Sequence, residues 1–207
     1  MSEYRLKAPL DKGDIDKLRI GDVVYLDGEI ITTAGFPTHK RIMDAIARSE
    51  EPPIDLKGAA FLHMGSCNIE TPDGIVTEYV NPTTSTRFNM FMPTLIRHFG
   101  FTAVGGKGGM DQACVDALRE TGCVYFSMIG GAAPLLTEGI KRLVQTGWDD
   151  LITQFRLSRF EVENFGPLLV AIDAHGHSRY ADLTSAATDR LPEIKRKLRE
   201  ARQASSI

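Results

Sequence analysis

The sequence predicts an α/β fold on three observations. Short apolar runs bounded by glycine or proline alternate along the chain with segments of helical spacing. Asp111 and Gly122 stand where an N-terminal and a C-terminal cap would enclose a helix between two such runs. No internal repeat, low-complexity segment or clear linker interrupts the alternation. The whole chain, residues 1–207, is therefore expected to form a single domain.

The first elements are predicted as strand, hairpin and helix. Residues 18–28 have the apolar content of a strand, and residues 29–33 are expected to pair with it across Asp27 and Gly28. Residues 39–49 have helical spacing, and two consecutive prolines follow them. Further buried strands are predicted from short apolar runs at 58–64, 102–104, 123–129 and 168–172.

Caps and prolines predict the next three helices. The first runs from residue 89 to about 98 and tolerates Pro93 because a proline fits the first turn. The second occupies residues 111–122. Pro134 is expected to start the third. Its predicted apolar stripe consists of Leu136, Ile140, Leu143 and Val144.

The carboxyl-terminal part is predicted as a strand followed by a charged helix. Apolar residues alternate from Phe155 to Val162, but the phase slips at Ser158 and Arg159, which indicates a bulge or bend. Residues 191–203 form a charged segment with helical spacing.

Bulk composition excludes several classes of protein. The net charge of -3 gives no general attraction for nucleic acid, and no apolar run approaches the ~20 residues of a membrane span. The N-terminus lacks the apolar core of a signal peptide. Three cysteines argue against a disulfide framework and for a reducing cytoplasm.

Three cationic loops predict an anion site. Residues 81–87 place four hydroxyl side chains beside Arg87, and Lys107 follows within a glycine-rich loop. Arg41 belongs to a third basic cluster upstream. Backbone N–H groups, hydroxyls and fixed cations together bind anions, and three cations suit a dicarboxylate better than a lone phosphate. The simpler alternatives are a tight glycine turn, helix-capping hydroxyls and a solvated Arg41.

Other chemistries find less support in the residues. The glycine loop matches neither a P-loop nor a dinucleotide fingerprint, because Lys107 is followed by Gly108 and no glycine or alanine stands at residue 111. Cys67, Cys114 and Cys123 have no metal-binding spacing, so buried inert thiols are expected and no metal ligand is predicted in this chain.

The ordered motifs resemble the β subunit, or equivalent C-terminal domain, of class I iron–sulfur fumarate hydratases and L(+)-tartrate dehydratases. The resemblance covers nearly the whole chain. The matching blocks are residues 18–26, 39–41, 55–58, 82–87, 106–110, 130–133 and 165–173. Two departures affect the local geometry: Asn81 replaces a usual glycine, and residues 33–37 lack a usual Arg-Asp pair.

The resemblance implies a three-layer swivelling β/β/α domain and specific site roles. Thr83 matches a catalytic threonine base, and Lys107 matches an active-site lysine. Arg41 and Arg87 match arginines that hold substrate carboxylates, and Thr84 is expected to join them. The resemblance further implies a [4Fe–4S] cluster as Lewis acid, ligated by a partner α subunit and not by this chain.

The expected activity is dehydration of L(+)-tartrate to oxaloacetate by a cytoplasmic heteromer, for which α2β2 is the expected assembly. The alternatives are the β subunit of a fumarate hydratase, acting on fumarate and malate, and a non-catalytic dicarboxylate-binding module. Neither nucleic acid nor membrane is an expected partner.

Overall fold

A ring of five hydrogen-bonded strands forms the centre of the protein. The computed structural model describes residues 1–72 and 74–204. Parallel pairing joins the first four strands of the ring in the order β2, β3, β6, β7, and the long strand β9 pairs antiparallel with both β7 and β2, which closes it. The ring strands are β2 (Val23–Thr32), β3 (Ala60–Leu62), β6 (Ala103–Gly106), β7 (Val124–Ser127) and β9 (Leu157–Ile172).

Two further strands widen this ring. β1 (Glu3–Ala8) pairs parallel with β2, and β8 (Ile140–Gly147) pairs antiparallel with β9. Alternate side chains of each ring strand point to opposite faces. In β3, for example, Phe61 packs in one apolar cluster while Ala60 and Leu62 pack in the other. The strands therefore separate two cores, one within the curved sheet and one beneath the helices.

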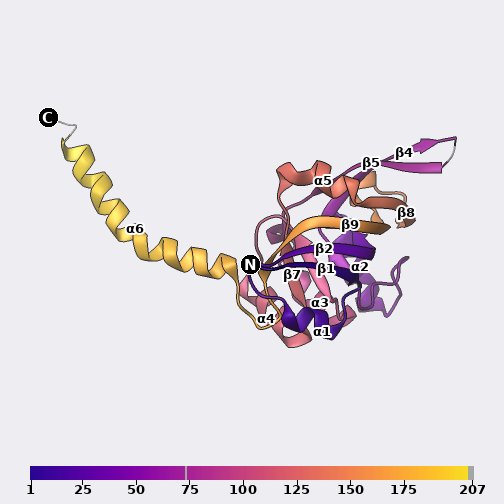
Figure 1. Cartoon of the computed structure of the whole chain (residues 1–207), viewed down its shortest axis with the longest axis horizontal. Coiled ribbons are helices and arrows are strands. Elements are labelled where there is room, and N and C mark those ends of the chain that lie inside the picture. Colours follow the sequence, from indigo (N-terminus) through magenta and orange to yellow (C-terminus); the bar gives the residue numbers. More distant parts are fainter. Residues whose placement is uncertain (73, 205–207) are drawn as a thin grey trace.

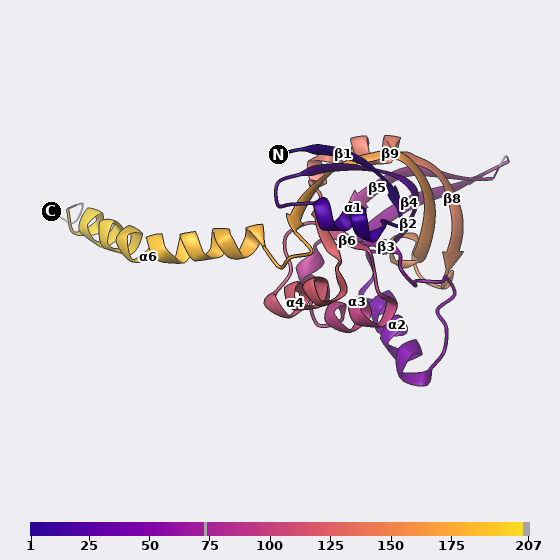
Figure 2. The same ribbon diagram turned by 60° about the horizontal axis from the view of Figure 1, so that its bottom comes forward.

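Three helices cover one side of the ring, as Figure 2 shows. They are α2 (Phe36–Arg48), α3 (Met92–Phe99) and α4 (Gln112–Thr121). The predicted caps of α4 are confirmed: Asp111 accepts from the Cys114 N–H at 3.1 Å, and Gly122 has a φ of 69°. The short helices α1 (Lys12–Lys17) and α5 (Ala133–Glu138) lie elsewhere in the fold.

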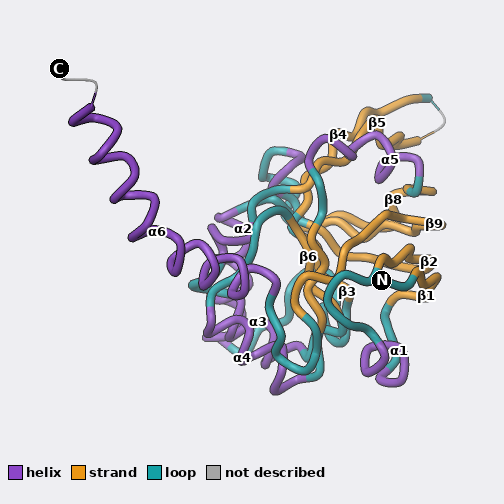
Figure 3. The backbone as a smooth tube through the Cα atoms, turned by 60° about the vertical axis from the view of Figure 1, so that its left-hand side comes forward, coloured by secondary structure: helices purple, strands orange, loops and turns teal. Residues whose placement is uncertain are grey.

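Two elements extend from the body (Figures 1 and 3). One is the hairpin of β4 (Met64–Thr71) and β5 (Gly74–Pro82), which the sequence analysis does not predict. The other is α6 (Arg179–Ala204), which contains the predicted charged helix 191–203 but begins at Arg179. Within the described residues, no helix is long and apolar enough to cross a membrane.

The predicted hairpin across Asp27 and Gly28 is wrong. β2 runs without interruption through these residues and pairs with β1 on one side. Gly28 has a φ of 100°, and a Cβ there would lie 2.3 Å from the carbonyl oxygen of Ala8. A glycine is therefore required here because two parallel strands lie close together. Sequence alone does not distinguish such a glycine from one in a turn.

The predicted helix after Pro134 is correct only to Glu138. Residues from Ile140 form β8 instead, because they pair with β9. A Cβ at Gly139 would lie 2.7 Å from the Cα of Phe165, so the backbones meet closely where the helix ends. The pairing of β8 with β9 is irregular near Arg159, where a bulge or bend was expected. The register shift lies on the β8 side, between Leu143, which pairs with Phe160, and Gln145, which pairs with Arg159.

The two strands predicted at 155–162 and 168–172 are parts of the continuous strand β9. The helix predicted from residue 89 starts at Met92, with Pro93 in its first turn as expected. The helix predicted for 39–49 starts earlier, at Phe36, where Pro37 occupies the first turn. Both prolines thus mark the true starts of their helices.

Candidate active site

The loop that carries Thr83 lies beside the loop that carries Lys107, at the carboxyl ends of β3 and β6. The Thr83 N–H donates to the carbonyl oxygen of His63 at 2.8 Å, and the Lys107 N–H donates to that of Thr83 at 2.8 Å. The Ser85 N–H donates back to the Lys107 carbonyl oxygen at 2.9 Å. Thr84 and Lys107 thereby form an isolated parallel bridge. In parallel sheets, ligands bind at this end of the strands.

Gly106 permits this close approach of the two loops. A Cβ at this position would lie 2.2 Å from Ser85 Oγ and 3.0 Å from the carbonyl oxygen of Thr83. Any larger residue would therefore push the hydroxyl-rich loop away from the strand. Gly108 has a φ of 70°, a left-handed conformation that glycine adopts without strain. Two of the loop's glycines thus have defined geometric functions.

Arg87 and Lys107 supply two positive charges to this place. An Arg87 guanidinium N–H donates to Thr83 Oγ1. The Lys107 side chain lies against the loop after β7, since a Cβ at Gly130 would be 3.2 Å from its Cδ. Among the described residues, neither cation forms an ion pair with a carboxylate. Cations on two adjoining loops, one of them bonded to a hydroxyl group, are suited to binding an anion.

The side chains at this site lie at an open surface. Thr83, Thr84 and Lys107 are half-buried, and Arg87 is exposed. Charge interactions are weak where water has free access, because water screens them. An additional surface that covers the loops would strengthen the grip on an anion.

A buried hydrogen-bond network supports the loop from behind. Ser85 Oγ lies 2.8 Å from His63 Nδ1 and 2.9 Å from the hydroxyl of Tyr125. The Tyr125 hydroxyl donates to the carbonyl oxygen of Gly108 at 2.8 Å. The network therefore ties the hydroxyl-rich loop and the glycine loop to the same buried side chains. Such networks fix a unique local geometry when every member has a partner.

Two buried histidines lie beneath Arg87. The imidazole of His39 stacks on Phe88 with ring centroids 4.0 Å apart, and His63 lies 5.3 Å from His39. Burial lowers the pKa of His39 to about 4. Burial, together with the charges of His39 and Arg87, lowers the pKa of His63 well below its usual value. Both rings are therefore neutral at pH 7.

The sequence analysis does not select His63, Ser85 or Tyr125. Ser85 lies inside the hydroxyl motif, where its neighbours attract more attention. His63 offers a usable signal, because it is a polar residue directly after a buried apolar strand. Tyr125 looks like an ordinary core aromatic, and only the fold shows that its hydroxyl meets Ser85.

The structure does not bring Arg41 into the group formed by Thr83, Arg87 and Lys107. The Arg41 guanidinium makes two hydrogen bonds to Asp150, at 2.8 and 2.6 Å, and lies over the Trp148 ring. This bidentate pair occupies the face of the guanidinium that would hold a carboxylate. A substrate role for Arg41 stays a prediction, and it requires the pair with Asp150 to open.

The three cysteines do not fit an iron–sulfur cluster. Cys114 and Cys123 are buried, and burial raises the pKa of each thiol, whereas cluster ligands are thiolates. Cys67 lies on the β4–β5 hairpin. Within residues 1–72 and 74–204, no three His, Cys, Asp or Glu side chains gather as a metal site.

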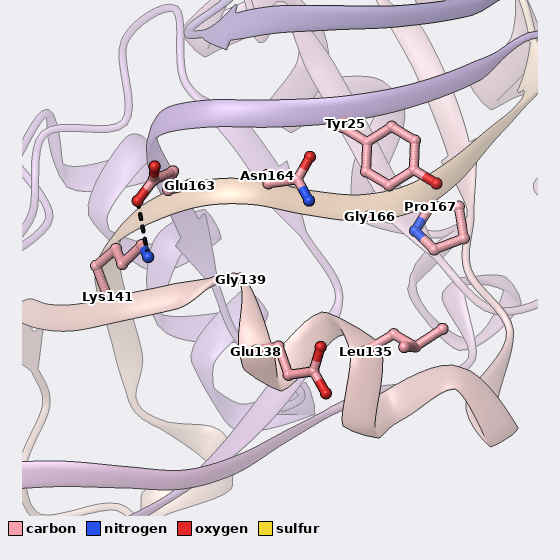
Figure 4. Close-up of a pocket in the computed structure, with 9 residues that line it drawn as sticks. All are labelled: Tyr25, Leu135, Glu138, Gly139, Lys141, Glu163, Asn164, Gly166 and Pro167. Carbon is pink, nitrogen blue, oxygen red and sulfur yellow. Dashed lines mark ion pairs between the residues drawn. The ribbon is translucent and has the colours of Figure 1, made fainter.

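A separate pocket of about 370 Å³ lies between α5 and β9 (Figure 4). Its lysine, Lys141, pairs with Glu163 at 2.7 Å, and Glu138 adds a second carboxylate. The lining thus offers an anion no unpaired lysine. None of the predicted site residues lines this pocket.

The sequence as a whole decides the family. A sequence model of the fumarase C-terminus family matches residues 2–183, which is most of the chain. The chain belongs to the fumarase C-terminus family. Relatives of similar length carry the name of a tartrate dehydratase subunit.

The Methanocaldococcus jannaschii relative, named "Putative L(+)-tartrate dehydratase subunit beta", is 35% identical over 186 residues, which cover 89% of this chain and 95% of the relative. The Escherichia coli K12 relative, L(+)-tartrate dehydratase subunit beta, is 32% identical over 182 residues and 86% of each chain. A Geobacillus stearothermophilus relative, "Putative fumarate hydratase class I", is 32% identical over 196 residues; the match covers 92% of this chain but 36% of that longer protein.

Proposed function

We propose that this protein is the β subunit of an iron–sulfur hydro-lyase that converts L(+)-tartrate to oxaloacetate. The observation that carries the proposal is that Arg87 donates to the Thr83 hydroxyl while the backbone of Lys107 is bonded to that of Thr83, and that neither cation forms an ion pair among the described residues. Tartrate is favoured over fumarate because the relatives named for tartrate are separate subunits of similar length, whereas the one named for fumarate is much longer.

The reaction removes a proton from a carbon next to a carboxylate and hydroxide from the adjacent carbon. The enol that results becomes oxaloacetate by moving one proton. Negative charge grows on the carboxylate as the first proton leaves. Arg87 and Lys107 are proposed to stabilise that charge, because fixed cations act most strongly on charge that develops beside them.

Thr83 is the proposed base. A threonine hydroxyl takes up a proton from carbon only after its own proton has passed to solvent, which leaves an alkoxide. The guanidinium of Arg87 donates to that oxygen, which favours negative charge on it. Thr84 is proposed to bind a substrate carboxylate through its hydroxyl, since its backbone is fixed against Lys107.

The hydroxide-removing step needs a Lewis acid, which we propose is a [4Fe–4S] cluster held by a partner α subunit. The poor fit of the three cysteines to a cluster and the open surface of the site support this division of labour. We further propose an α2β2 assembly in a reducing cytoplasm, with this chain as a three-layer domain that swivels against its partner.

The test is anaerobic reconstitution with the α subunit, followed by measurement of kcat/KM on L(+)-tartrate, malate and fumarate. We expect the largest value for tartrate. Lys107→Met should lower kcat/KM by on the order of 10²–10³ without preventing assembly. Lys141→Met is the matched control, because Lys141 is paired with Glu163 outside the site. Equal effects of the two substitutions, or preference for fumarate and malate, would contradict the proposal.

A further inference from the structure

The helix α6 is exposed along almost its whole length. Every side chain from Ala181 to Gln203 is exposed, and the helix extends away from the body (Figures 1 and 2). Its 26 residues correspond to a rod of roughly 40 Å. The match to the fumarase C-terminus family ends at residue 183, so most of this rod lies outside the matched segment. The catalytic proposal assigns it no part.

Large apolar side chains of α6 gather on one side. Successive residues of a helix are about 100° apart around its axis. On this count the large apolar side chains fall within an arc of roughly 80°, and Ala187 lies among them. They are 44% to 54% exposed, so the body of the protein does not cover them. The set consists of Leu183, Leu191, Ile194 and Leu198. A stripe of this width is typical of a helix that packs against another protein surface.

Charges border the stripe in a fixed pattern. Counted in the same way, Arg190 and Lys197 lie along one edge and Lys195 along the other. The carboxylates of the helix fall outside these edges, where Glu200 pairs with Arg196 at 2.7 Å and Glu193 pairs with the edge residue Lys197 at 2.8 Å. Besides the paired Lys197, each edge thus carries a basic side chain, Arg190 on one edge and Lys195 on the other. A second copy of this helix would set lysine and arginine against lysine and arginine in either orientation, which disfavours self-pairing.

The base of α6 is fixed to the candidate active site. The Tyr180 ring covers Gly109, where a Cβ would lie 2.5 Å from Tyr180 Cγ. The Tyr180 hydroxyl donates to Ser127 Oγ at 2.8 Å. Gly109 is two residues from Lys107, so the helix leaves the body from the edge of the open site. A protein that covers the site would meet this helix at its base.

We propose that α6 is a docking arm for the cluster-bearing partner subunit, which receives the apolar stripe in a groove bordered by carboxylates. This inference rests on the proposed function, since that function requires the partner. Pro192 lies opposite the stripe, and a proline inside a helix opens the side on which it lies.

The test compares the affinity of the partner subunit for four forms of the full-length chain, measured by sedimentation under anaerobic conditions. The wild-type chain is compared with Leu191→Gln/Leu198→Gln and with Lys195→Glu/Lys197→Glu. The control is Arg196→Glu/Arg199→Glu, which makes the same change of charge on the same helix but away from the stripe. Circular dichroism checks that each variant keeps its helix content.

We expect the leucine and lysine variants to bind the partner at least tenfold more weakly and the arginine control to bind within threefold of wild type. At saturating partner, turnover by the lysine variant should return to the wild-type value, because the arm lies outside the catalytic loops. Equal affinity of all four chains would overturn the docking arm while leaving the catalytic proposal intact. Failure of the wild-type chain to bind the partner would instead refute the proposed function.

Three other outcomes would also overturn the inference. One is self-association of the free chain that the leucine variant abolishes while partner affinity stays unchanged. The second is binding of the free chain to anionic phosphatidylserine vesicles, and the third is its binding to single-stranded RNA. In each case the lysine variant would lose this binding while its affinity for the partner subunit stays unchanged. Each would assign the stripe and its basic edges to another occupant.

Discussion

Replacement of Gly106 by alanine should separate the two loops of the site. The added Cβ would lie 2.2 Å from Ser85 Oγ, whereas ordinary contact begins near 3.4 Å, so the groups must part by about 1.2 Å. Rotation of Ser85 would not suffice, because the Cβ would also lie 3.0 Å from the Thr83 carbonyl oxygen. The Thr83 carbonyl oxygen must therefore move by about 0.4 Å (3.4 minus 3.0), and buried Ser85, which His63 and Tyr125 hold in place, transmits its larger displacement of about 1.2 Å to the same loop.

A displacement of about 1 Å at a catalytic group costs on the order of 10² in rate. Overpacking should also destabilise the fold by roughly 1–3 kcal/mol. The assay is kcat of the reconstituted heteromer, with thermal unfolding of the free chain measured in parallel. We expect kcat to fall about a hundredfold while the chain stays folded at the assay temperature.

Two companion variants identify the cause of this loss. Gly131→Ala is the matched control, because a Cβ there meets nothing within 4 Å, and its kcat should stay within twofold of wild type. Ser85→Ala combined with Gly106→Ala removes the clashing oxygen and should recover part of the lost rate. Full activity of the single Gly106→Ala variant would refute the claim that loop spacing sets catalysis.

Two more predictions concern the base and the buried histidines. Thr83→Ala should lower kcat by on the order of 10²–10⁴ with assembly unchanged, and kcat within twofold of wild type would remove Thr83 from the mechanism. His39 has a pKa of about 4 when folded and about 6.5 when unfolded, so below pH 6.5 the unfolded state binds more protons. Stability should therefore fall by roughly 2 kcal/mol from pH 7.5 to 5, with the lowered pKa of His63 acting in the same direction. Urea unfolding of wild type and His39→Phe at both pH values measures this change. If the free energy of unfolding of the variant falls between pH 7.5 and 5 by as much as that of wild type, His39 is not the cause.

Sequence patterns predicted the elements whose signals are local. Asp111 and Gly122 cap α4 because a side-chain oxygen and a left-handed glycine act within one turn of the helix. Pro93 likewise falls in the first turn of α3, as predicted, whereas the start of α2 at Phe36 was missed. Patterns failed where a distant strand decides the conformation. Ile140 and Leu143 have helical spacing with Leu136, yet they form β8 because β9 offers hydrogen bonds to them.

The site shows the same division between local and distant information. The motif at 81–87 and Lys107 were both selected from sequence, and the structure places their backbones in contact. The partner of Arg41 was not predictable, because Asp150 lies 109 positions away and no local pattern connects the two. The same holds for the contact between Tyr125 and Ser85, which depends on the order of strands in the ring.

The most direct measurement of the central claim is turnover of L(+)-tartrate by this chain alone, by the α subunit alone and by their anaerobic mixture. Each preparation receives iron and sulfide beforehand, and bound iron is determined for each. We predict that the mixture converts tartrate to oxaloacetate, that neither subunit does so alone, and that iron is found with the α subunit. Turnover and a bound cluster in this chain by itself would contradict the account.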